Sequence, residues 1–321
     1  MDEIEVQGFL EEALTERDTQ LQEKEMPDVN IGEAIPIEEN LDPAMEYDEY
    51  GIVEVMGSLK DGIIGNKTNS LLTIDSDITA MKAPVAQWAK AQTWTQQELE
   101  KVAKLGINLP SFKQDTLYSN AVATIQYAGY VGHEQVKGQV GLLTSDKVQV
   151  ITDAGGKTIA EMTSDEVVKM ILDAYGVAWS NSDYRIAPTH IAFHAQDFMA
   201  LMQKFDPNPV IVGTDLLPIS AMDRIMAALR KASGNDSFTL TFVKVPQDLA
   251  VGVVAGKTRF AIYSYNADYL AMNVMMPSLL QVRQRDLLTY ECGYRSAFTG
   301  VKWKVPQSAV YVDYKTSVAT P

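Results

Sequence analysis

The chain has 321 residues and a net charge of −15, and its length predicts roughly two domains. Apolar residues make up 46% of it, which is enough for a buried core. That composition excludes a wholly disordered chain, and the apolar runs are too short to predict a transmembrane helix. The acidic start MDEIEVQGFLEE lacks the features of a signal peptide, and a lone cysteine, Cys292, excludes an internal disulfide framework and favours assembly in a reducing cytosol.

The excess negative charge lies at the N-terminal end. Residues 1–60 hold 18 acidic residues and only three basic ones, so the remainder of the chain is neutral. Residues 1–56 also contain three prolines and one short helical pattern near residues 4–14. Two interpretations stay open: a solvated, loosely ordered acidic arm, or an arm that becomes ordered when it meets a partner.

Residues 57–93 have the pattern of an extended, two-stranded flap. Leu72, Ile74 and Ile78 recur at even spacing, which indicates a strand. Pro84 favours an edge strand, because proline has no N–H group to donate to a neighbour.

Two helices with clear start signals are predicted next. Thr95 and Glu98 form a capping box, in which each side chain accepts from the other residue's backbone N–H. Ser111 and Gln114 form a second box, and the helix that they open can run to about Val131. A helix of that length spans roughly 30 Å, and its broad apolar stripe predicts burial along one side.

Two further helices and a strand-rich tail follow. Thr163 and Glu166 open a third helix that Gly176 should end, and a fourth begins at Ser220 and stops before Gly234. Alternating or continuous apolar runs predict strands at residues 238–242, 251–255, 260–265, 279–290, 301–305 and 310–314. Because helices and strands mix without a βαβ rhythm, the fold class is α+β.

Two short sequences end like a phosphate-binding loop. They are Gly156-Lys157-Thr158 and Gly256-Lys257-Thr258. Ile151 and Val251 stand where that motif requires its first glycine, so we interpret both as turns with a solvated lysine.

The remaining reactive side chains form no recognisable catalytic or metal-binding motif. His190 and His194 have a spacing that suits zinc on a helix, but their surroundings predict a strand leading into a helix. His133 has no partner nearby in sequence, and Cys292 fits a small buried thiol in a strand. The sequence therefore predicts no cofactor, no metal and no enzymatic activity.

Residues 94–150 carry the most specific resemblance to a known family, and the tail repeats it. The first stretch combines a capped helix, a long helix, a glycine turn and a Gly-Leu-Leu segment at Trp94-Thr95, Glu98-Leu99, Gly132-His133 and Gly141-Leu142-Leu143. The tail carries the matching features at Arg295, Gly300, Pro306 and either Tyr311 or Tyr314. Together they resemble the major capsid proteins of tailed bacteriophages, whose Hong Kong 97-like fold is shared with encapsulins.

This resemblance implies a division of the chain and a function. Residues 1–56 would be the N-terminal arm, residues 57–93 the extended loop, residues 94–160 and 277–321 the peripheral domain with its long spine helix, and residues 161–276 the axial domain. Copies would form pentamers and hexamers of an icosahedral head, assembled in the host bacterial cytoplasm. The virion shell would enclose double-stranded DNA without sequence-specific binding and without a membrane. Scaffold, portal and decoration proteins are further partners that the family allows.

A stripe of basic residues near the C-terminus is the predicted inter-subunit site. We expect acidic side chains of one subunit's arm to cover the basic stripe of a neighbour, formed by Arg283, Arg285, Arg295, Lys302 and Lys304. Two alternative functions stay open: an encapsulin-like nanocompartment shell, and a cytosolic enzyme with an unrecognised active site. Assembly into shells would separate the first from the second, and the shell's content would separate a virus from an encapsulin.

Overall fold

The computed structural model describes most of the chain and divides it into two compact units. The described residues are 30–42, 44–56, 75–104, 109–153, 155–206, 210–212, 215–217, 219–246 and 249–317. The described part of the smaller unit consists of residues 89–104, 109–120 and 279–294. The larger unit holds the other described residues. The predicted helix at residues 4–14 lies outside the described residues, and the predicted arm, loop and domain boundaries stay predictions.

A mixed sheet forms the centre of the larger unit. Its strands, in spatial order, are β4 (Gln149–Thr152), β14 (Val310–Lys315), β10 (Lys257–Tyr263), β5 (His190–His194) and β8 (Thr241–Val245), with β9 (Val251–Val254) also paired to β10. β4 with β14 and β5 with β8 are parallel, whereas β10 is antiparallel to both of its main neighbours. Alternate residues from Phe260 to Tyr263 of β10 enter two separate cores, so this half of the strand is buried on both faces and is a continuous apolar run.

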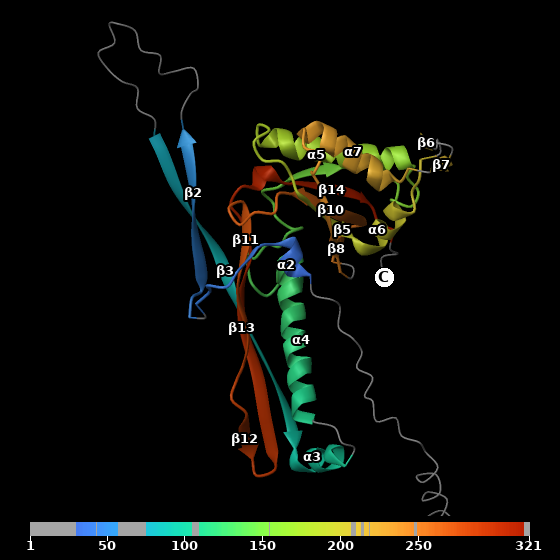
Figure 1. Cartoon of the computed structure of the whole chain (residues 1–321). Helices are drawn as coiled ribbons and strands as arrows, with labels where there is room; N and C mark the ends of the chain where they lie inside the picture. The colour runs from blue at the N-terminus through green and yellow to red at the C-terminus, as the bar shows by residue number, and fades with distance from the viewer. Residues whose placement is uncertain are drawn as a thin grey trace, which may run out of the picture. The chain divides into compact units, whose positions relative to one another are not determined.

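Three helices contribute to the core on one face of this sheet. They are α5 (Ser164–Asn181), α6 (Ala195–Met202) and α7 (Ala221–Ser233), and Figure 1 shows α5 and α7 lying across the same face. The capping box of Thr163 and Glu166 is confirmed, as is the Gly234 end of α7, where φ is +64°. The predicted end at Gly176 is wrong. Gly176 is exposed and costs the helix only about 1 kcal/mol, while Ala178 beyond it is fully buried and holds the last turn in place.

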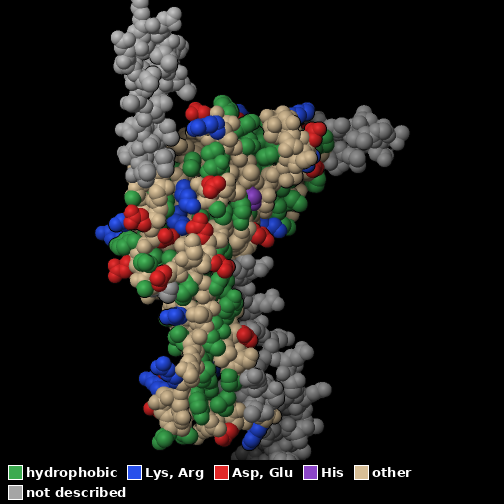
Figure 2. Space-filling model, turned by 60° about the vertical axis from the view of Figure 1, so that its left-hand side comes forward, with side chains coloured by type: hydrophobic (Ala, Val, Ile, Leu, Met, Phe, Trp, Pro, Cys, Tyr) green, Lys and Arg blue, Asp and Glu red, His purple; other side chains and the backbone are tan. Residues whose placement is uncertain are grey.

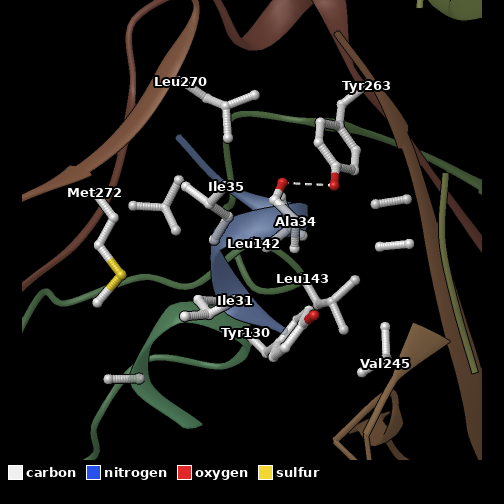
Figure 3. Packing of buried hydrophobic residues seen from close by; sticks show 14 of the residues in the cluster. Ile31, Ala34, Ile35, Tyr130, Leu142, Leu143, Val245, Tyr263, Leu270 and Met272 are labelled. Atoms are coloured by element: carbon white, nitrogen blue, oxygen red, sulfur yellow. Dashed lines mark hydrogen bonds between the residues drawn. The ribbon is translucent and has the colours of Figure 1, made fainter. Parts of the chain in front are cut away.

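Residues 30–56 contain more regular structure than their acidic composition predicts. They form α2 (Ile31–Ala34), β1 (Ile37–Glu38) and β2 (Tyr47–Met56). Figure 3 shows α2 within the core on the sheet's second face, where Tyr263 Oη donates a hydrogen bond of 2.7 Å to the Ala34 carbonyl. Ile35 is fully buried. Because Ile31, Ala34 and Ile35 belong to this core, α2 folds as part of the larger unit.

An antiparallel two-stranded ribbon is present, but its first strand, β2, lies wholly before the predicted flap of residues 57–93. β2 and β3 (Asp75–Thr95) pair antiparallel from Tyr47 opposite Pro84 to Met56 opposite Asp75. The sheet continues through β13 (Thr289–Trp303), β11 (Leu270–Leu279) and β1. β3 is therefore not an edge strand; Pro84 fits because it pairs with Tyr47, where β2 begins. Residues 57–74 lie outside the described part.

The smaller unit has its own apolar cluster of Trp94, Leu117 and Cys292. The capping box that opens α3 (Gln96–Ala103) is confirmed, since Thr95 Oγ1 accepts from the Glu98 N–H at 3.2 Å. The predicted capping box of Ser111 and Gln114 is wrong, because α4 (Leu109–Tyr130) already includes Ser111. The helix begins earlier since the fixed φ of Pro110 suits a helix's first turn. β12 (Arg283–Asp286) forms a hairpin with β13. The remaining short elements are β6 (Val210–Val212), β7 (Asp215–Leu217) and the 3-10 turn η1 (Pro306–Ser308).

Candidate functional site

The five residues of the predicted basic stripe are divided between the two compact units. Arg283 and Arg285 belong to the smaller unit and are exposed on β12, where a register irregularity between Gln284 and Asp286 interrupts the strand's two-residue alternation. The other three stripe residues, Arg295, Lys302 and Lys304, belong to the larger unit. Arg295 is exposed, whereas Lys302 is buried and Lys304 half-buried.

Lys302 sits at the centre of a charged cluster that ties the N-terminal segment to β13. Its Nζ lies 2.7 Å from Glu38 Oε2 and 2.9 Å from Asp48 Oδ2, and its side chain is only 4% exposed. Lys304 Nζ lies 3.4 Å from Glu38 Oε1. Asn273 Nδ2 completes the group with a hydrogen bond to Asp48. We call these five residues the Lys302 cluster.

Backbone pairing places the carboxylates of the Lys302 cluster. β1 pairs parallel with β11, which sets Glu38 opposite Asn273. Burial acts to lower the pKa of Lys302, but its hydrogen bonds with Glu38 and Asp48 outweigh burial and leave the pKa raised. For Glu38, burial acts to raise the pKa, yet the hydrogen bond and charge of Lys302 leave it lowered. Both groups are therefore held in their charged forms.

The acidic segment thus meets two stripe lysines inside one chain. The sequence predicts such contacts between the arm of one subunit and the stripe of another, and that contact between subunits stays a prediction. Further bonds hold the same segment: Tyr265 Oη donates to the Gly32 carbonyl at 2.7 Å, and Tyr130 Oη donates to Asn30 Oδ1 at 2.9 Å. Sequence reasoning missed this attachment, although Ile31, Ile35 and Ile37 stand out as apolar residues in acidic surroundings.

A second buried ion pair, also missed from the sequence, crosses the central sheet. Arg259 of β10 stands opposite Asp313 of β14, and its Nε and Nη2 donate to the two carboxylate oxygens at 2.6 and 2.9 Å. Its Nη1 donates to the Leu143 carbonyl at 2.9 Å, and Tyr311 Oη donates to the Leu142 carbonyl at 2.6 Å. This bidentate pair fixes the 142–145 loop onto the sheet.

His190, His194 and Cys292 lie in the strands of the larger and smaller units. His190 and His194 lie on β5 followed by α6, as predicted, and His194 Nδ1 is 3.1 Å from the buried Asp197. Cys292 is buried in β13, and burial raises the pKa of its thiol. Within the described ranges, no group of three or more His, Cys, Asp or Glu side chains could hold a metal ion.

The predicted turn is confirmed at Gly256, between β9 and β10, but Lys257 and Thr258 already belong to β10. Gly156, Lys157 and Thr158 lie in an irregular loop after β4. Gly156 and Gly256 have φ values of +59° and +71°, a conformation that glycine adopts without strain. Lys157 makes a surface ion pair of 2.6 Å with Glu166. Across the described residues, no helix is long and apolar enough to cross a membrane.

Comparison with known proteins identifies a family. Residues 60–314 match the family described as Major capsid protein. No curated protein matches the sequence.

Solved structures show the same fold. The capsid of Myoviridae phage XM1 is 17% identical with a TM-score of 0.75, over 94% of this chain and 97% of that one. The capsid of a native GTA particle is 11% identical with a TM-score of 0.63, over 95% and 96%. The holo-SrpI encapsulin complex of Synechococcus elongatus PCC 7942 is 8% identical with a TM-score of 0.53, over 100% and 98%.

Proposed function

Because the chain belongs to the major capsid protein family, we propose that its copies assemble into the closed head shell of a tailed bacteriophage. The family match over residues 60–314 carries this proposal. The chain is a capsid shell subunit with the α+β, Hong Kong 97-like fold, and its place is the virion capsid. The likeness to an encapsulin concerns the fold alone.

The surface of the smaller unit supports assembly. Leu287 is 92% exposed and Leu288 58% exposed at the turn of the β12–β13 hairpin. Leu279, Leu280 and Val282 are exposed nearby in the chain. Because soluble proteins rarely leave large neighbouring apolar side chains in water, this segment supports a protein–protein interface.

The finer organisation of the shell follows from the family. Subunits would form pentamers and hexamers, with residues 94–160 and 277–321 as the peripheral domain and residues 161–276 as the axial domain. Residues 1–56 would serve as the arm and residues 57–93 as the loop that reaches over a neighbour. Assembly in the host bacterial cytoplasm and contacts with scaffold, portal and decoration proteins belong to the same proposal, as does the absence of catalysis.

Charge distribution supports enclosure of double-stranded DNA without sequence-specific binding. On the face that Figure 2 shows, basic and acidic side chains are interspersed. Non-specific DNA binding relies on many Lys and Arg side chains that lie on one surface and contact the backbone phosphates. A subunit with this mixed face would surround packaged DNA without binding it tightly.

The decisive experiment is electron microscopy and size-exclusion chromatography of the purified chain, with scaffold supplied. We expect pentamers, hexamers or closed shells, since subunits of such shells bury interfaces well above roughly 2,000 Å². A stable monomer at high concentration would contradict the proposal. Nuclease-protected double-stranded DNA in shells from infected cells is expected; a protein cargo instead would favour an encapsulin.

A further inference from the structure

The smaller unit contains a pocket of about 290 Å³ beside the β12–β13 hairpin. Two small residues on neighbouring strands, Ala91 of β3 and Gly293 of β13, leave this space open, and Leu280 forms an apolar wall. We call it the Gly293 pocket. The turn of the same hairpin carries Leu287, whose side chain is 92% exposed. We propose that Leu287 of one copy inserts into the Gly293 pocket of a second copy of the chain.

The Gly293 pocket is open to solvent and is fixed by backbone contacts. The Leu280 backbone N–H donates to the Gly293 carbonyl at 2.7 Å, which holds the apolar wall against β13. A Cβ atom on Gly293 would lie 3.2 Å from the Lys90 carbonyl oxygen and 3.4 Å from Leu280 Cδ1, so a side chain at this position would crowd the space. Ala91 is exposed and Leu280 is 41% exposed, so an incoming side chain can reach both.

The turn that carries Leu287 is held in place by two hydrogen bonds. Gln284 Nε2 donates to the Leu287 carbonyl at 2.9 Å. The Gln96 backbone N–H donates to the Leu288 carbonyl at 2.8 Å. Figure 1 shows this end of the β12–β13 hairpin next to α3. Because the turn is already ordered, burying Leu287 against a partner costs little further conformational entropy.

The occupant of the pocket must come from another copy. Leu288, next to Leu287, and Gly293 are separated along β13 by five residues, which span roughly 17 Å in a strand. A leucine side chain is far shorter than this, so Leu287 cannot fill the pocket of its own hairpin. Copies meet in the assembled shell, so this inference rests on the proposed function and adds a specific contact to it.

The charges around the turn and around the pocket complement each other. Arg283 and Glu291 line the pocket and form no ion pair among the described residues, although they stand opposite each other on β12 and β13. Arg285 and Asp286, just before Leu287, are exposed and equally unpaired within the described part of the chain. A docked turn therefore brings one base and one acid to one base and one acid of the pocket. Exposed pairs contribute little affinity, so they select the orientation while the leucine supplies the affinity.

The direct test is an electron cryo-microscopy structure of shells assembled from the unmodified chain. We expect the Leu287 side chain of one copy within about 4 Å of Leu280 and Gly293 of a second copy. An empty pocket, or a pocket filled by a different segment or by another protein, would overturn the inference.

Two variants of Leu287 test the energetic contribution. Leu287→Ser removes the apolar side chain, whereas Leu287→Met keeps it. Withdrawing one leucine side chain from water shifts an association equilibrium by at least roughly tenfold, so we expect Leu287→Ser to lower shell yield by that factor and Leu287→Met to retain it. Both unassembled variants should unfold like the unmodified subunit, because this side chain lies in water. Equal shell yields from the two variants would overturn the inference.

The pocket provides a second pair of variants that leaves Leu287 unchanged. Ala91→Leu fills the pocket, and Ala89→Leu adds the same side chain to the same strand outside it. Both positions are exposed, so neither substitution disturbs a core. Only Ala91→Leu should reduce the yield, and equal yields would contradict the inference. Failure of the unmodified chain to form any shell would overturn the proposed function as well, whereas normal shells with an empty Gly293 pocket would overturn the inference alone.

Discussion

Lys302 of β13 and Arg283 of β12 carry the same charge in neighbouring parts of the sequence, yet they have opposite surroundings. The Lys302 side chain is 4% exposed and contacts two carboxylates. Arg283 is exposed, and its cross-strand neighbour is Glu291. The same kind of residue therefore stabilises the fold in the larger unit and is available to a partner in the smaller unit. Burial, rather than charge, decides which role a basic residue takes.

The largest effect should come from the pair in which both partners are buried. Asp313→Ala would leave the Arg259 guanidinium buried without its carboxylate, which we expect to lower the free energy of unfolding by about 3–5 kcal/mol. Denaturant unfolding of the unassembled subunit measures this. Arg259→Met combined with Asp313→Leu removes both charges and should recover most of the loss. A single variant as stable as the unmodified chain would show that burial does not strengthen this pair.

The second-largest loss of unfolding free energy is expected in the Lys302 cluster. Lys302→Met leaves Glu38 and Asp48 without their shared partner, but those side chains are 28% and 20% exposed and can be partly rehydrated. We therefore expect a loss of about 1–3 kcal/mol, below the value for a fully buried pair. Lys304→Met is the matched control, expected to lose at most about 1 kcal/mol. Equal losses from both lysines would contradict the central place of Lys302.

Acid should weaken the same cluster in a defined direction. The pKa of Glu38 is lowered in the folded chain, so its contribution is fully present above the unfolded value near 4.5 and is lost as pH falls through the folded pKa. Glu38→Gln should reduce the loss of unfolding free energy between pH 6 and strongly acidic conditions. Glu39→Gln is the neighbouring exposed control. Identical pH profiles for the Glu38 variant and the unmodified chain would argue against the ion pair.

The exposed arginines should change stability least. Arg283→Gln with Arg285→Gln should leave the free energy of unfolding within about 0.5 kcal/mol, because both side chains lie in water. Shell yield across a salt series then tests the predicted inter-subunit stripe without disturbing the fold. A charge-reversing substitution of Lys302 would change the stability of the fold as well as the shell yield, so it would not test the stripe alone. If the yield and its salt dependence match the unmodified chain, these arginines are not the arm's partner.

Local signals along the chain explain the successful predictions. The capping boxes at Thr95 and Thr163 depend on residues three apart, so the sequence itself contains both partners of each hydrogen bond. The Gly234 end of α7 is equally local. The predicted end of α5 at Gly176 is wrong, because a glycine only weakens a helix. The burial of Ala178 against distant residues stabilises the last turn by more than the glycine costs.

What the sequence by itself determined is the fold class, most helix starts, the strand pattern of the tail and the family resemblance. Only the tertiary structure decided that α2 and β1 pack into the larger unit and that the basic stripe divides into buried and exposed members. Lys302 and Glu38 are 264 positions apart, and Arg259 and Asp313 are 54 apart. A basic side chain becomes a buried ion-pair partner only when the fold removes water from it and brings a carboxylate to it, and both conditions depend on packing between distant segments.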